Sequence, residues 1–455
     1  MSLDVVILAA GQGSRMRSHL PKVLHTLAGR SMLQRIIDSA RQLSDVTIHV
    51  VVGHGAEQIE AALAGQPDIH FVYQHQQLGT GHAVAQVLPA LGDGPVLILT
   101  GDTPLLTAAT LEQLSTGLAQ DQLTLLSVVH EDPSGYGRIV RDDSGQVTAI
   151  VEQKDASEQQ RRIRECNTGL MGTTGKLLKR WLPALSANNA QGEYYLTDIV
   201  GMAYAEGVPL DAVQASCVEE VSGVNDRRQL AALERWLQHQ QAEQAMAQGA
   251  SLADPARFDQ RGTLKLGRDV SIDVGCIFEG DVTLEDGVSI GPYCVVRNAH
   301  IGSGTHIEAY SHIEEASAAG NNQIGPYARL RPGSKLAAEV RVGNFVEIKK
   351  ATLDHGTKVN HLSYIGDAHV GQHTNVGAGT ITCNYDGVNK HHTEIGSHVF
   401  VGSNTALVAP ITIGDHVTIA AGSTLTESVE RGLVLGRARQ TVKEEWQRPE
   451  QADGD

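Results

Sequence analysis

Residues 395–425 read IGSHVFVGSNTALVAPITIGDHVTIAAGSTL, and an aliphatic residue returns at every sixth position of this stretch. These aliphatic residues are Ile395, Val401, Leu407, Ile413, Ile419 and Leu425. Neither an amphipathic helix nor an ordinary strand repeats every six residues. A β-solenoid does, because six residues form one flat side of a coil and stack an aliphatic side chain inside it. The stretch therefore predicts a β-helix.

The same spacing extends upstream, beginning at Ile272 and continuing to Val376 with shifts of phase. Small residues tend to follow four places after the aliphatic ones, as at Cys294, Thr305, Ser311, Ser334, Thr374, Thr380, Thr405 and Ser423. We therefore predict an all-β domain over residues 249–455. The repeat is lost after Arg437, and the polar end of the tail, residues 449–455, is expected to fray.

The first part of the chain, residues 1–227, alternates strands and helices. Apolar runs predict strands at residues 5–8, 47–52, 70–73 and 96–99, and helical periodicity predicts helices at residues 32–43, 56–63 and 81–88. Such alternation implies a mainly parallel sheet with helices on both faces. Ligands bind beyond the carboxyl ends of such strands, where Gly11 and Asp102 fall.

A long amphipathic helix is predicted from about residue 226 to residue 248, because leucines recur along one face and Gly249 ends the pattern. With this helix the chain divides into three parts: an α/β domain at 1–227, a helical linker at 228–248 and the solenoid domain at 249–455. The 455 residues also exceed what one hydrophobic core holds.

Composition argues against several classes of partner and site. The net charge of -16 argues against nucleic acid as the main partner, because a phosphate backbone needs a basic surface. The five cysteines are odd in number and form no CxxC pair, which disfavours disulfides and zinc and favours reduced thiols in the cytoplasm. We see no signal-peptide pattern after Met1 and no apolar run long enough for an integral membrane segment.

Residues 8–16, LAAGQGSRM, directly follow the first strand. Glycines there let backbone N–H groups approach phosphate oxygens, and Arg15 and Lys22 can neutralise a triphosphate. The loop lacks the GxxxxGK[ST] of a P-loop, and Met16 stands where a dinucleotide-binding loop has its third glycine. A plain structural turn is the alternative.

LAAGQGSRM followed by LPKVL at residues 20–24 resembles the signature of sugar-nucleotide pyrophosphorylases. Further matching segments are LGTGH at 78–82, TGD at 100–102, GYGR at 135–138, NTG at 167–169, GEYYLTD at 192–198 and GVN at 223–225. Together with the hexapeptide repeats, the whole chain resembles the bacterial family of bifunctional N-acetylglucosamine-1-phosphate uridylyltransferases and glucosamine-1-phosphate N-acetyltransferases. The resemblance implies a Rossmann-like α/β nucleotidyltransferase domain and a left-handed parallel β-helix.

The first implied reaction transfers a uridylyl group from UTP to N-acetylglucosamine 1-phosphate and releases pyrophosphate. A sugar phosphate dianion is already a nucleophile near neutral pH, because its second pKa lies near ~6, so no protein base is needed. By resemblance Asp102 and Asn225 hold Mg²⁺, while Arg15 and Lys22 are the catalytic cations. Taken alone, Asp102 could organise a turn and Asn225 could cap the long helix.

The resemblance also implies the remaining contacts of this site. The residues expected to bind UTP or its sugar-nucleotide product are Leu8, Ala9, Ala10, Gly11, Lys22, Gln74, Gly79, Thr80, Thr100, Gly101, Asp102, Gly137, Glu152, Asn167 and Asn225. Of these, Gln74, Gly79 and Thr80 are expected to recognise uracil. Gly137, Glu152 and Asn167 are expected to hold the N-acetylglucosamine moiety. Thr100 departs from the family, in which an aromatic residue is common.

A second site is expected on the solenoid, where residues 382–394 interrupt the repeat. An ammonium group cannot attack a thioester until a base removes a proton, and histidine, with an ordinary pKa near ~6.5, suits this task. By resemblance His361 is that catalytic base, although a lone solenoid histidine is more often a plain surface residue. Asn360 stands before it where we expect glycine.

The implied ligands of the second site fall into two groups. Glucosamine 1-phosphate is expected at Arg331, Lys349, Tyr364 and Asn375. Acetyl-CoA is expected at Ala378, Asn384, Tyr385, Ser403, Ala421 and Arg437. The family forms homotrimers with these sites between subunits, acetylates first and uridylylates second, and supplies UDP-N-acetylglucosamine to peptidoglycan and lipopolysaccharide.

Two other hypotheses compete with the bifunctional enzyme. A single-activity pyrophosphorylase with a regulatory or oligomerising β-helix needs no histidine, lysine and arginine set on the coils, which this chain has. A non-catalytic assembly subunit predicts loss of Asp102, Lys22 or the glycine loop, and all are present.

Overall fold

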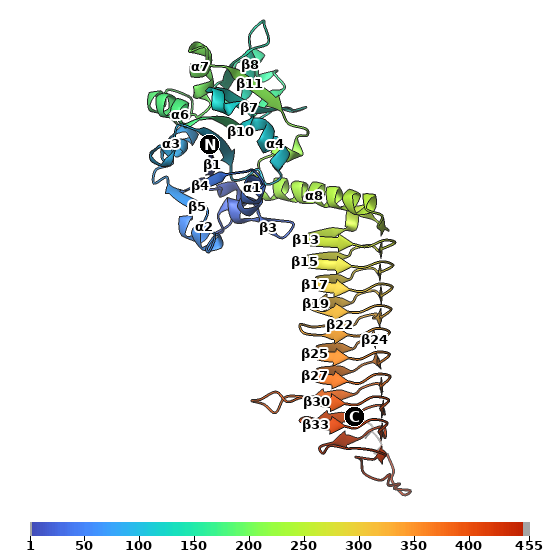
Figure 1. The fold of residues 1–455 in the computed structure, drawn as a ribbon. Coiled ribbons are helices and arrows are strands. Elements are labelled where there is room, and N and C mark those ends of the chain that lie inside the picture. Colours follow the sequence, from blue (N-terminus) through green and yellow to red (C-terminus); the bar gives the residue numbers. More distant parts are fainter. Residues whose placement is uncertain (1, 449–455) are drawn as a thin grey trace, which may run out of the picture. The chain divides into compact units, whose positions relative to one another are not determined.

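The computed structural model describes residues 2–448, so the predicted fraying of residues 449–455 lies outside it. The chain divides into two compact units, with the boundary between Gln238 and His239. Helix α8 (Arg227–Ala247) contains this boundary. Figure 1 shows an α/β fold in the first unit and a stack of coils in the second.

The first unit is built on one twisted sheet with the strand order β11-β7-β10-β6-β1-β4-β5. Its strands are β1 (Leu3–Leu8), β4 (Val46–Val52), β5 (Ile69–Tyr73), β6 (Pro95–Thr100), β7 (Leu123–Val129), β10 (Glu165–Thr174) and β11 (Leu210–Gln214). Strand β1 runs parallel to β4 and β6, whereas β10 runs antiparallel to β6 and β7. Two hairpins accompany it: β8 (Arg138–Arg141) with β9 (Val147–Val151), and β2 (Thr26–Leu27) with β3 (Arg30–Ser31).

Helices cover both faces of this sheet because side chains alternate along β1. Val5 and Ile7 pack under α1 (Met32–Ala40), α2 (Ala56–Ala62) and α4 (Ala108–Ser115). Val6 packs on the other face, under α3 (Thr80–Ala85), α6 (Gly175–Trp181) and α7 (Asp198–Ala205). The remaining short helices are α5 (Glu158–Arg161), η1 (Ser14–Met16), η2 (Lys22–Leu24), η3 (Leu88–Ala90), η4 (Leu118–Gln120), η5 (Leu182–Ala184), η6 (Glu219–Val221) and η7 (Pro255–Arg257).

The predicted strands and helices of the first unit are confirmed within a few residues. The helix predicted at 32–43 ends earlier, at Ala40, because the chain turns at Arg41. The antiparallel strand β10 was not predicted, since its small and polar residues carry no clear period.

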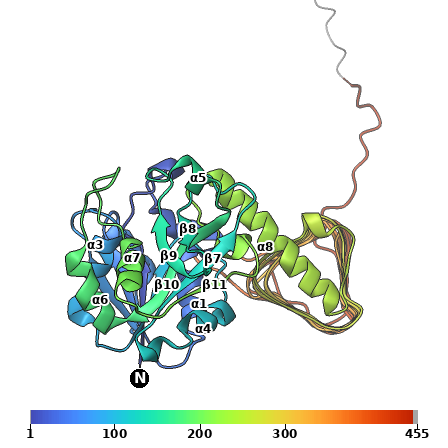
Figure 2. The same cartoon turned by 90° about the horizontal axis from the view of Figure 1, so that it is seen from above.

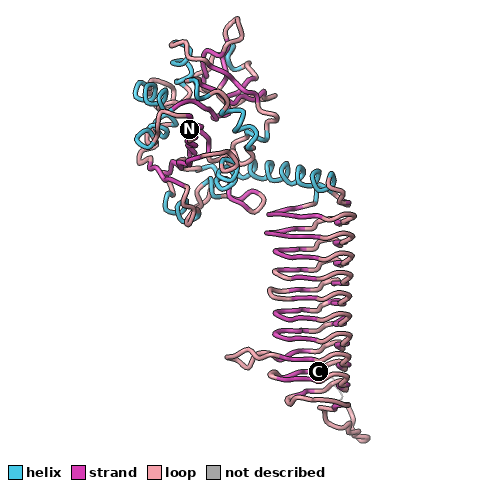
Figure 3. The backbone as a smooth tube through the Cα atoms, in the orientation of Figure 1, coloured by secondary structure: helices cyan, strands magenta, loops and turns pink. Residues whose placement is uncertain are grey.

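The second unit is a parallel β-helix, as predicted. Its first sheet contains β12 (Ser251–Leu252), β14 (Ser271–Ile272), β16 (Ser289–Ile290), β18 (His306–Ile307), β21 (Gln323–Ile324), β24 (Arg341–Asn344), β26 (Lys358–His361), β28 (Asn375–Val376), β31 (Phe400–Val401), β34 (Thr418–Ile419) and β36 (Leu433–Val434). Its second sheet contains β13 (Asp259–Leu266), β15 (Ile277–Leu284), β17 (Val295–Ile301), β19 (His312–Glu314), β20 (Ser317–Ala318), β22 (Arg329–Leu330), β23 (Lys335–Leu336), β25 (Glu347–Leu353), β27 (Tyr364–Val370), β29 (Ile381–Cys383), β30 (Thr393–Ile395), β32 (Ala406–Val408), β33 (Ile411–Ile413) and β35 (Thr424–Leu425). Strands repeat as short rungs down the stack (Figure 3), and the coils superpose when seen from above (Figure 2).

The interior of the coils explains the six-residue pattern. Every in-phase aliphatic residue is buried, from Ile272 at 3% exposure to Leu425 at 4%. The small residues are buried as well, and their hydroxyl groups donate to backbone carbonyls: Thr305 Oγ1 to Ala319 O at 3.0 Å and Thr357 Oγ1 to Gly371 O at 3.0 Å. A buried hydroxyl is therefore satisfied, which is why serine and threonine fit inside the coil.

The predicted interruption of the repeat is a loop between β29 and β30. One coil step from Leu353 to Val370 spans 17 residues, whereas the next, from Val370 to Ile395, spans 25. The extra residues form a projection closed by a bridge between Tyr385 and Lys390. This insertion, residues 384–392, is seen beside β30 in Figure 1. None of the helices in the described chain is long and apolar enough to cross a bilayer.

Candidate active sites

The first candidate site lies where β1 and β6 end side by side. Leu8 is in register with Thr100, and the Gly101 N–H donates to Leu8 O at 2.9 Å. The predicted glycine loop and Asp102 therefore leave the same edge of the sheet. Gly13 has φ +61, and a Cβ on it would fall 2.6 Å from Lys22 Cβ, so only glycine lets the loop close on Lys22.

Two cationic and two oxygen-bearing side chains meet at this edge. The Lys22 ammonium lies 2.5 Å from Asp102 Oδ2 and donates to Asn225 Oδ1 at 3.3 Å. Arg15 Nη2 donates to the same Asn225 oxygen at 3.0 Å. Asp226, not Asn225, caps α8, because Asp226 Oδ1 accepts from the N–H groups of the following turn. The capping hypothesis for Asn225 is therefore wrong.

The donor set suits a hard divalent cation. Asp102 offers a carboxylate and Asn225 an amide oxygen, and the Lys22 ammonium already bonds to both of these oxygens. Residues 2–448 contain no cluster of three or more His, Cys, Asp or Glu side chains that could hold a metal. A cation here would take its other ligands from water and substrate phosphates.

A cavity of about 190 Å³ opens beside the glycine loop. It is lined by Gln12, Val52, Gly53, His54, Tyr73, Gln74, His75 and Gln77. Gln74 is the predicted uracil contact among them, and its Nε2 donates to Gly79 O at 3.1 Å. Thr80 begins α3, and its hydroxyl accepts from the Leu196 N–H at 3.1 Å. The predicted uracil contacts are thus brought together, although Gly79 and Thr80 are not among the residues that line the cavity.

The predicted sugar contacts also gather, at the base of the β8–β9 hairpin. The Asn167 N–H donates to Gly137 O at 2.9 Å, and a Cβ on Gly137 would lie 3.3 Å from Glu152 Oε1. Burial raises the pKa of Glu152, and the hydrogen bond from Thr197 at 3.3 Å only partly opposes this.

The remaining loop contacts divide into buried and open positions. Ala9 and Ala10 are buried, and the Ala9 N–H donates to Val51 O at 2.8 Å. A Cβ on Gly11 would meet nothing within 4 Å, so a ligand can approach its backbone. The Thr100 hydroxyl is 3.0 Å from that of Thr103, which anchors the turn before Asp102.

On the solenoid, one group of predicted residues forms a polar cluster on the second sheet. Arg331 Nη1 donates to Glu347 Oε1 at 2.8 Å, which raises the pKa of Arg331. Asn384 Nδ2 is 3.5 Å from the Tyr364 hydroxyl and donates to Asp367 at 2.5 Å. We call Arg331, Lys349, Tyr364, Asn384 and Lys390 the polar cluster.

Lys390 in this cluster was missed by the sequence reasoning. It reaches from the insertion to Lys349, and the contact with that second ammonium lowers the pKa of Lys390. Two like charges held together are favoured where an anion lies between them. The only signal in the sequence was its place in the insertion.

A second group forms a column along one corner of the coils. The Gly379, Asn404 and Gly422 N–H groups donate to the carbonyls of His361, Ala378 and Ser403, at 3.2, 2.7 and 2.7 Å. A Cβ on Gly422 would lie 3.8 Å from Arg437 Cδ, at the end of this column. We call His361, Ala378, Ser403 and Ala421 the corner column.

The left-handed backbone position of this corner changes along the stack. In the early coils it holds aromatic rings that stack at 5.4, 5.1 and 5.1 Å: Tyr293, Tyr310, Tyr327 and Phe345. The next coil has Leu362 at this position, and the coils after it have residues without an aromatic ring: Gly379, Asn404 and Gly422. The corner beside Ala378, Ser403 and Ala421 therefore lacks the aromatic wall of the earlier coils.

His361 is oriented by a neighbour in the preceding coil. Its Nδ1 is 2.8 Å from Asn344 Oδ1, an oxygen that can only accept. The bond therefore puts the proton of a neutral imidazole on Nδ1 and leaves Nε2 as the basic nitrogen.

The structure does not join these two groups within one chain. His361 ends β26 of the first sheet, and Arg331 and Lys349 belong to the second sheet. Across residues 2–448, no hydrogen bond or ion pair links His361 to Arg331 or Lys349. Asn375 lies in β28 beside Lys358 and lines a separate groove of about 530 Å³. The predicted contact Tyr385 is at the base of the insertion, where its hydroxyl donates to Gly387 O at 2.5 Å.

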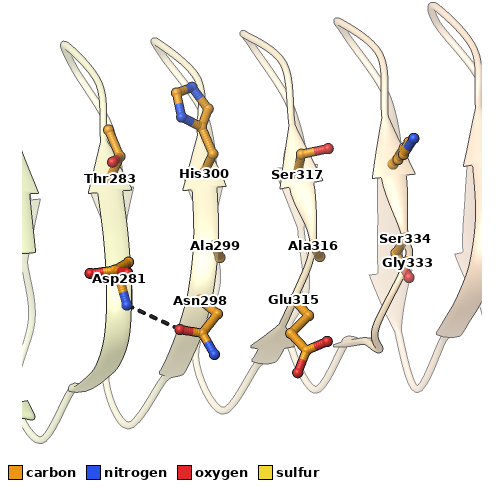
Figure 4. Close-up of a pocket in the computed structure, with 11 residues that line it drawn as sticks. Asp281, Thr283, Asn298, Ala299, His300, Glu315, Ala316, Ser317, Gly333 and Ser334 are labelled. Atoms are coloured by element: carbon orange, nitrogen blue, oxygen red, sulfur yellow. Dashed lines mark hydrogen bonds between the residues drawn. The ribbon is translucent and has the colours of Figure 1, made fainter. Parts of the chain in front are cut away.

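Another groove, of about 440 Å³, lies on the early coils. Figure 4 shows small residues such as Ala299 and Ala316 on its floor, between Asn298 and Glu315 on one side and His300 and Ser317 on the other. It contains none of the predicted site residues.

Comparison with known proteins identifies the family. Residues 5–252 match the MobA-like NTP transferase domain, and residues 392–427 match the bacterial transferase hexapeptide with six repeats. The Bifunctional protein GlmU of Cellvibrio japonicus is 57% identical over 449 residues, which cover 98% of this chain and 99% of that protein. The chain belongs to the GlmU family. The Bifunctional protein GlmU of Marinobacter nauticus is 56% identical over 452 residues, covering 99% of each chain.

Family membership decides between the hypotheses drawn from the sequence. Like other members of the GlmU family, the chain is a bifunctional enzyme that carries out uridylyl transfer and acetyl transfer. The single-activity pyrophosphorylase and the non-catalytic subunit are therefore excluded.

Proposed function

We propose that the first unit binds UTP and N-acetylglucosamine 1-phosphate at the shared edge of β1 and β6. The convergence of Arg15, Lys22, Asp102 and Asn225 carries this proposal. Gln74, Gly79 and Thr80 would recognise uracil, and Gly137, Glu152 and Asn167 would hold the sugar. The backbone of residues 8–11 would approach the phosphates.

Mg²⁺ would be held by Asp102 and Asn225, where it would offset phosphate charge when bound. The sugar phosphate oxygen attacks the α-phosphorus of UTP, and the bond to pyrophosphate breaks. Lys22 and Arg15 neutralise the charge that moves to pyrophosphate, and no side chain needs to remove a proton. Asp102 and Asn225 would hold this cation, and Lys22 would then bond to a phosphate oxygen.

The second unit would transfer an acetyl group from acetyl-CoA to glucosamine 1-phosphate. His361 Nε2 takes a proton from the sugar ammonium, and the freed amine attacks the thioester carbonyl. The C–S bond then breaks, and the second proton that the nitrogen loses on forming the amide converts the leaving thiolate to the CoA thiol. Arg331, Lys349, Tyr364 and Asn375 would bind the sugar phosphate. Acetyl-CoA would lie along Ala378, Ser403 and Ala421 to Arg437, with Asn384 and Tyr385 near the acetyl end.

A homotrimer would complete the second site. His361 lies on the first sheet and Lys349 on the second sheet of one chain, so a neighbouring copy would supply one of the two groups. Mixing and reassembling His361→Ala and Lys349→Ala proteins should then restore acetyl transfer, because some interfaces combine two intact halves. No restored activity in verified mixed oligomers would contradict a shared site.

The order of reactions would be acetylation followed by uridylylation, with UDP-N-acetylglucosamine as the product for peptidoglycan and lipopolysaccharide. We place the enzyme in the cytoplasm, where all five cysteines can stay as the free thiols of the structure.

Reciprocal variants test the assignment of activities. Asp102→Ala should abolish uridylyl transfer and spare acetyl transfer, whereas His361→Ala should do the reverse. Separate assays with N-acetylglucosamine 1-phosphate and with glucosamine 1-phosphate measure each reaction alone. Loss of both activities in either folded variant would contradict independent sites.

A further inference from the structure

Gln74 is a buried amide with one unused oxygen. Its residue is 3% exposed, and its Nε2 is bonded twice, to Gly79 O at 3.1 Å and to His82 Nδ1 at 3.1 Å. In the described part of the chain, no donor is bonded to Gln74 Oε1. Gln74 lines the 190 Å³ cavity beside the glycine loop, so its oxygen is free to accept a hydrogen bond from a ligand there. The cavity therefore suits a ligand that brings an N–H group to this oxygen.

The orientation of this amide decides which base it can read. Uracil carries a hydrogen on ring nitrogen N3, whereas N3 of cytosine is a bare acceptor. With Nε2 held away, Gln74 presents an oxygen that accepts from uracil and repels cytosine. A half-turn of the amide would present an NH₂ group instead and reverse this preference.

His82 is the side chain that opposes such a half-turn. Its Nδ1 accepts from Gln74 when the proton is on Nε2. Gln86 lies on the other side of the ring, with its amide nitrogen 3.2 Å from His82 Nε2 and 3.1 Å from His82 O. Gln86 is partly exposed, so its amide can turn its oxygen to the Nε2–H and give up its bond to His82 O to solvent.

We propose that His82 is a positioning residue that selects uracil nucleotides over cytosine nucleotides, by fixing the carboxamide of Gln74 with its oxygen toward the base. This rests on the proposed role of Gln74 in uracil binding and assigns to His82 a task that touches no substrate. His82 lies on α3, one turn beyond Gly79. Residues 79–82 therefore supply both acceptors for the Gln74 amide nitrogen, the carbonyl of Gly79 and the Nδ1 of His82.

The test compares three nucleotides in uridylyl transfer: UTP, CTP and dTTP, which keeps the N3 hydrogen. In His82→Leu the ratio of kcat/KM for UTP over CTP should fall at least about tenfold, because the carbonyl of Gly79 is then the one remaining bond that holds the amide nitrogen of Gln74. The ratio of UTP over dTTP and the KM for N-acetylglucosamine 1-phosphate should stay unchanged. His82→Asn should restore the UTP preference, since its Oδ1 takes the place of Nδ1 as the acceptor.

Two further variants distinguish the role of His82 from the proposed role of Gln74 in uracil binding. His70→Leu, an exposed histidine on β5, is the matched control and should leave every ratio unchanged. If Gln74→Leu lowers UTP selectivity but His82→Leu does not, the role of His82 is overturned while the uracil site stands. If Gln74→Leu leaves UTP kinetics unchanged, the uracil site itself is wrong and the role of His82 falls with it. The unchanged KM for N-acetylglucosamine 1-phosphate reports that the first unit of each variant is correctly folded.

Discussion

At the scale of single residues, Lys390 shows how a charge can matter without any pattern around it. It projects from the insertion against Lys349, and the contact lowers the pKa of Lys390. An anion between two such ammonium groups removes their repulsion and gains charge-assisted hydrogen bonds. We therefore count Lys390 with Lys349 and Arg331 as a candidate phosphate contact.

Replacing Lys390 tests this assignment. Lys390→Gln should raise the KM for glucosamine 1-phosphate about tenfold or more, because a hydrogen bond to a charged group is worth about 1.5–3 kcal/mol. Uridylyl transfer should not change. Lys335→Gln, which removes the same charge from β23 outside the cluster, is the control. An unchanged KM in Lys390→Gln would remove Lys390 from the site.

At the scale of elements, neighbouring coils lie so close together that some backbone positions can hold only glycine. Gly343 follows the buried Val342, and a Cβ on it would overlap the backbone carbonyl of Asn360 in the next coil. Forced overlap in a packed interior costs about 1–3 kcal/mol. The coil-to-coil distance is therefore maintained by glycine at this position of β24.

Gly343→Ala should lower the unfolding free energy of the second unit by that amount. Denaturant unfolding followed by circular dichroism measures the change as a shift of the midpoint. Gly201→Ala in α7 is the control, because its Cβ would meet nothing within 4 Å and should cause no loss. Equal stability of the two variants would show that the coils can move apart.

A second element-scale feature is a histidine that links neighbouring coils of the stack. His369 lies between Glu394 Oε1 at 2.5 Å and Asp354 Oδ2 at 2.9 Å. Burial alone would lower the pKa of His369, but the hydrogen bonds to Glu394 and Asp354 outweigh it and raise the pKa. The raised pKa means that these bonds stabilise the folded state while the imidazole is charged.

This stabilisation should depend on pH. It is fully present below the ordinary histidine pKa of about 6.5 and is lost as pH rises through the raised folded value. His369→Gln should therefore lower the Tm at pH 6 and change it little at pH 9. The effect should stay below about 1 kcal/mol, because these side chains are 37–41% exposed and solvent screens them.

The matching control is His312→Gln, because His312 pairs with no carboxylate among residues 2–448. Its Tm difference from the natural chain should be independent of pH. A His369→Gln difference that grows toward pH 9 would contradict the assigned direction.

At the scale of the whole molecule, the two units have separate cores and separate candidate sites. The core of the second unit contains Ala242 and the coil residues, and the sheet of the first unit has its own two clusters. A chain ending at Ala247, the last residue of α8, should therefore fold and retain uridylyl transfer while losing acetyl transfer. Steady-state kinetics with UTP would check this, and an unfolded or inactive fragment would show that the first unit depends on the coils.

The sequence predicted the periodic parts of this molecule and missed the parts set by distant contacts. The in-phase aliphatic positions of the coils could be assigned, because burial of a stacked side chain imposes the period directly. Ala318 occupies the same kind of position but was missed, since a short phase shift and a small side chain hide it. The hydrogen bond between His82 and Gln74 could not be predicted either, because it produces no periodic pattern in the sequence.

The candidate sites were predictable only to the extent that a local motif carries them. Lys22 and Asp102 lie far apart in the chain, and their contact follows from the parallel pairing of β1 with β6. The separation of His361 from Lys349 could not be read from the repeat, because it depends on which sheet each position joins.

The corner column has a consequence for the length of anything that binds along it. Successive coils of a parallel sheet are spaced by about 4.8 Å, so the three steps from His361 to Ala421 span roughly 14 Å. Because the stack is rigid, an elongated ligand bound along the column must have a length that matches a whole number of coil spacings. Adding or deleting one coil between the two ends would change the required length by one coil spacing, without altering either end.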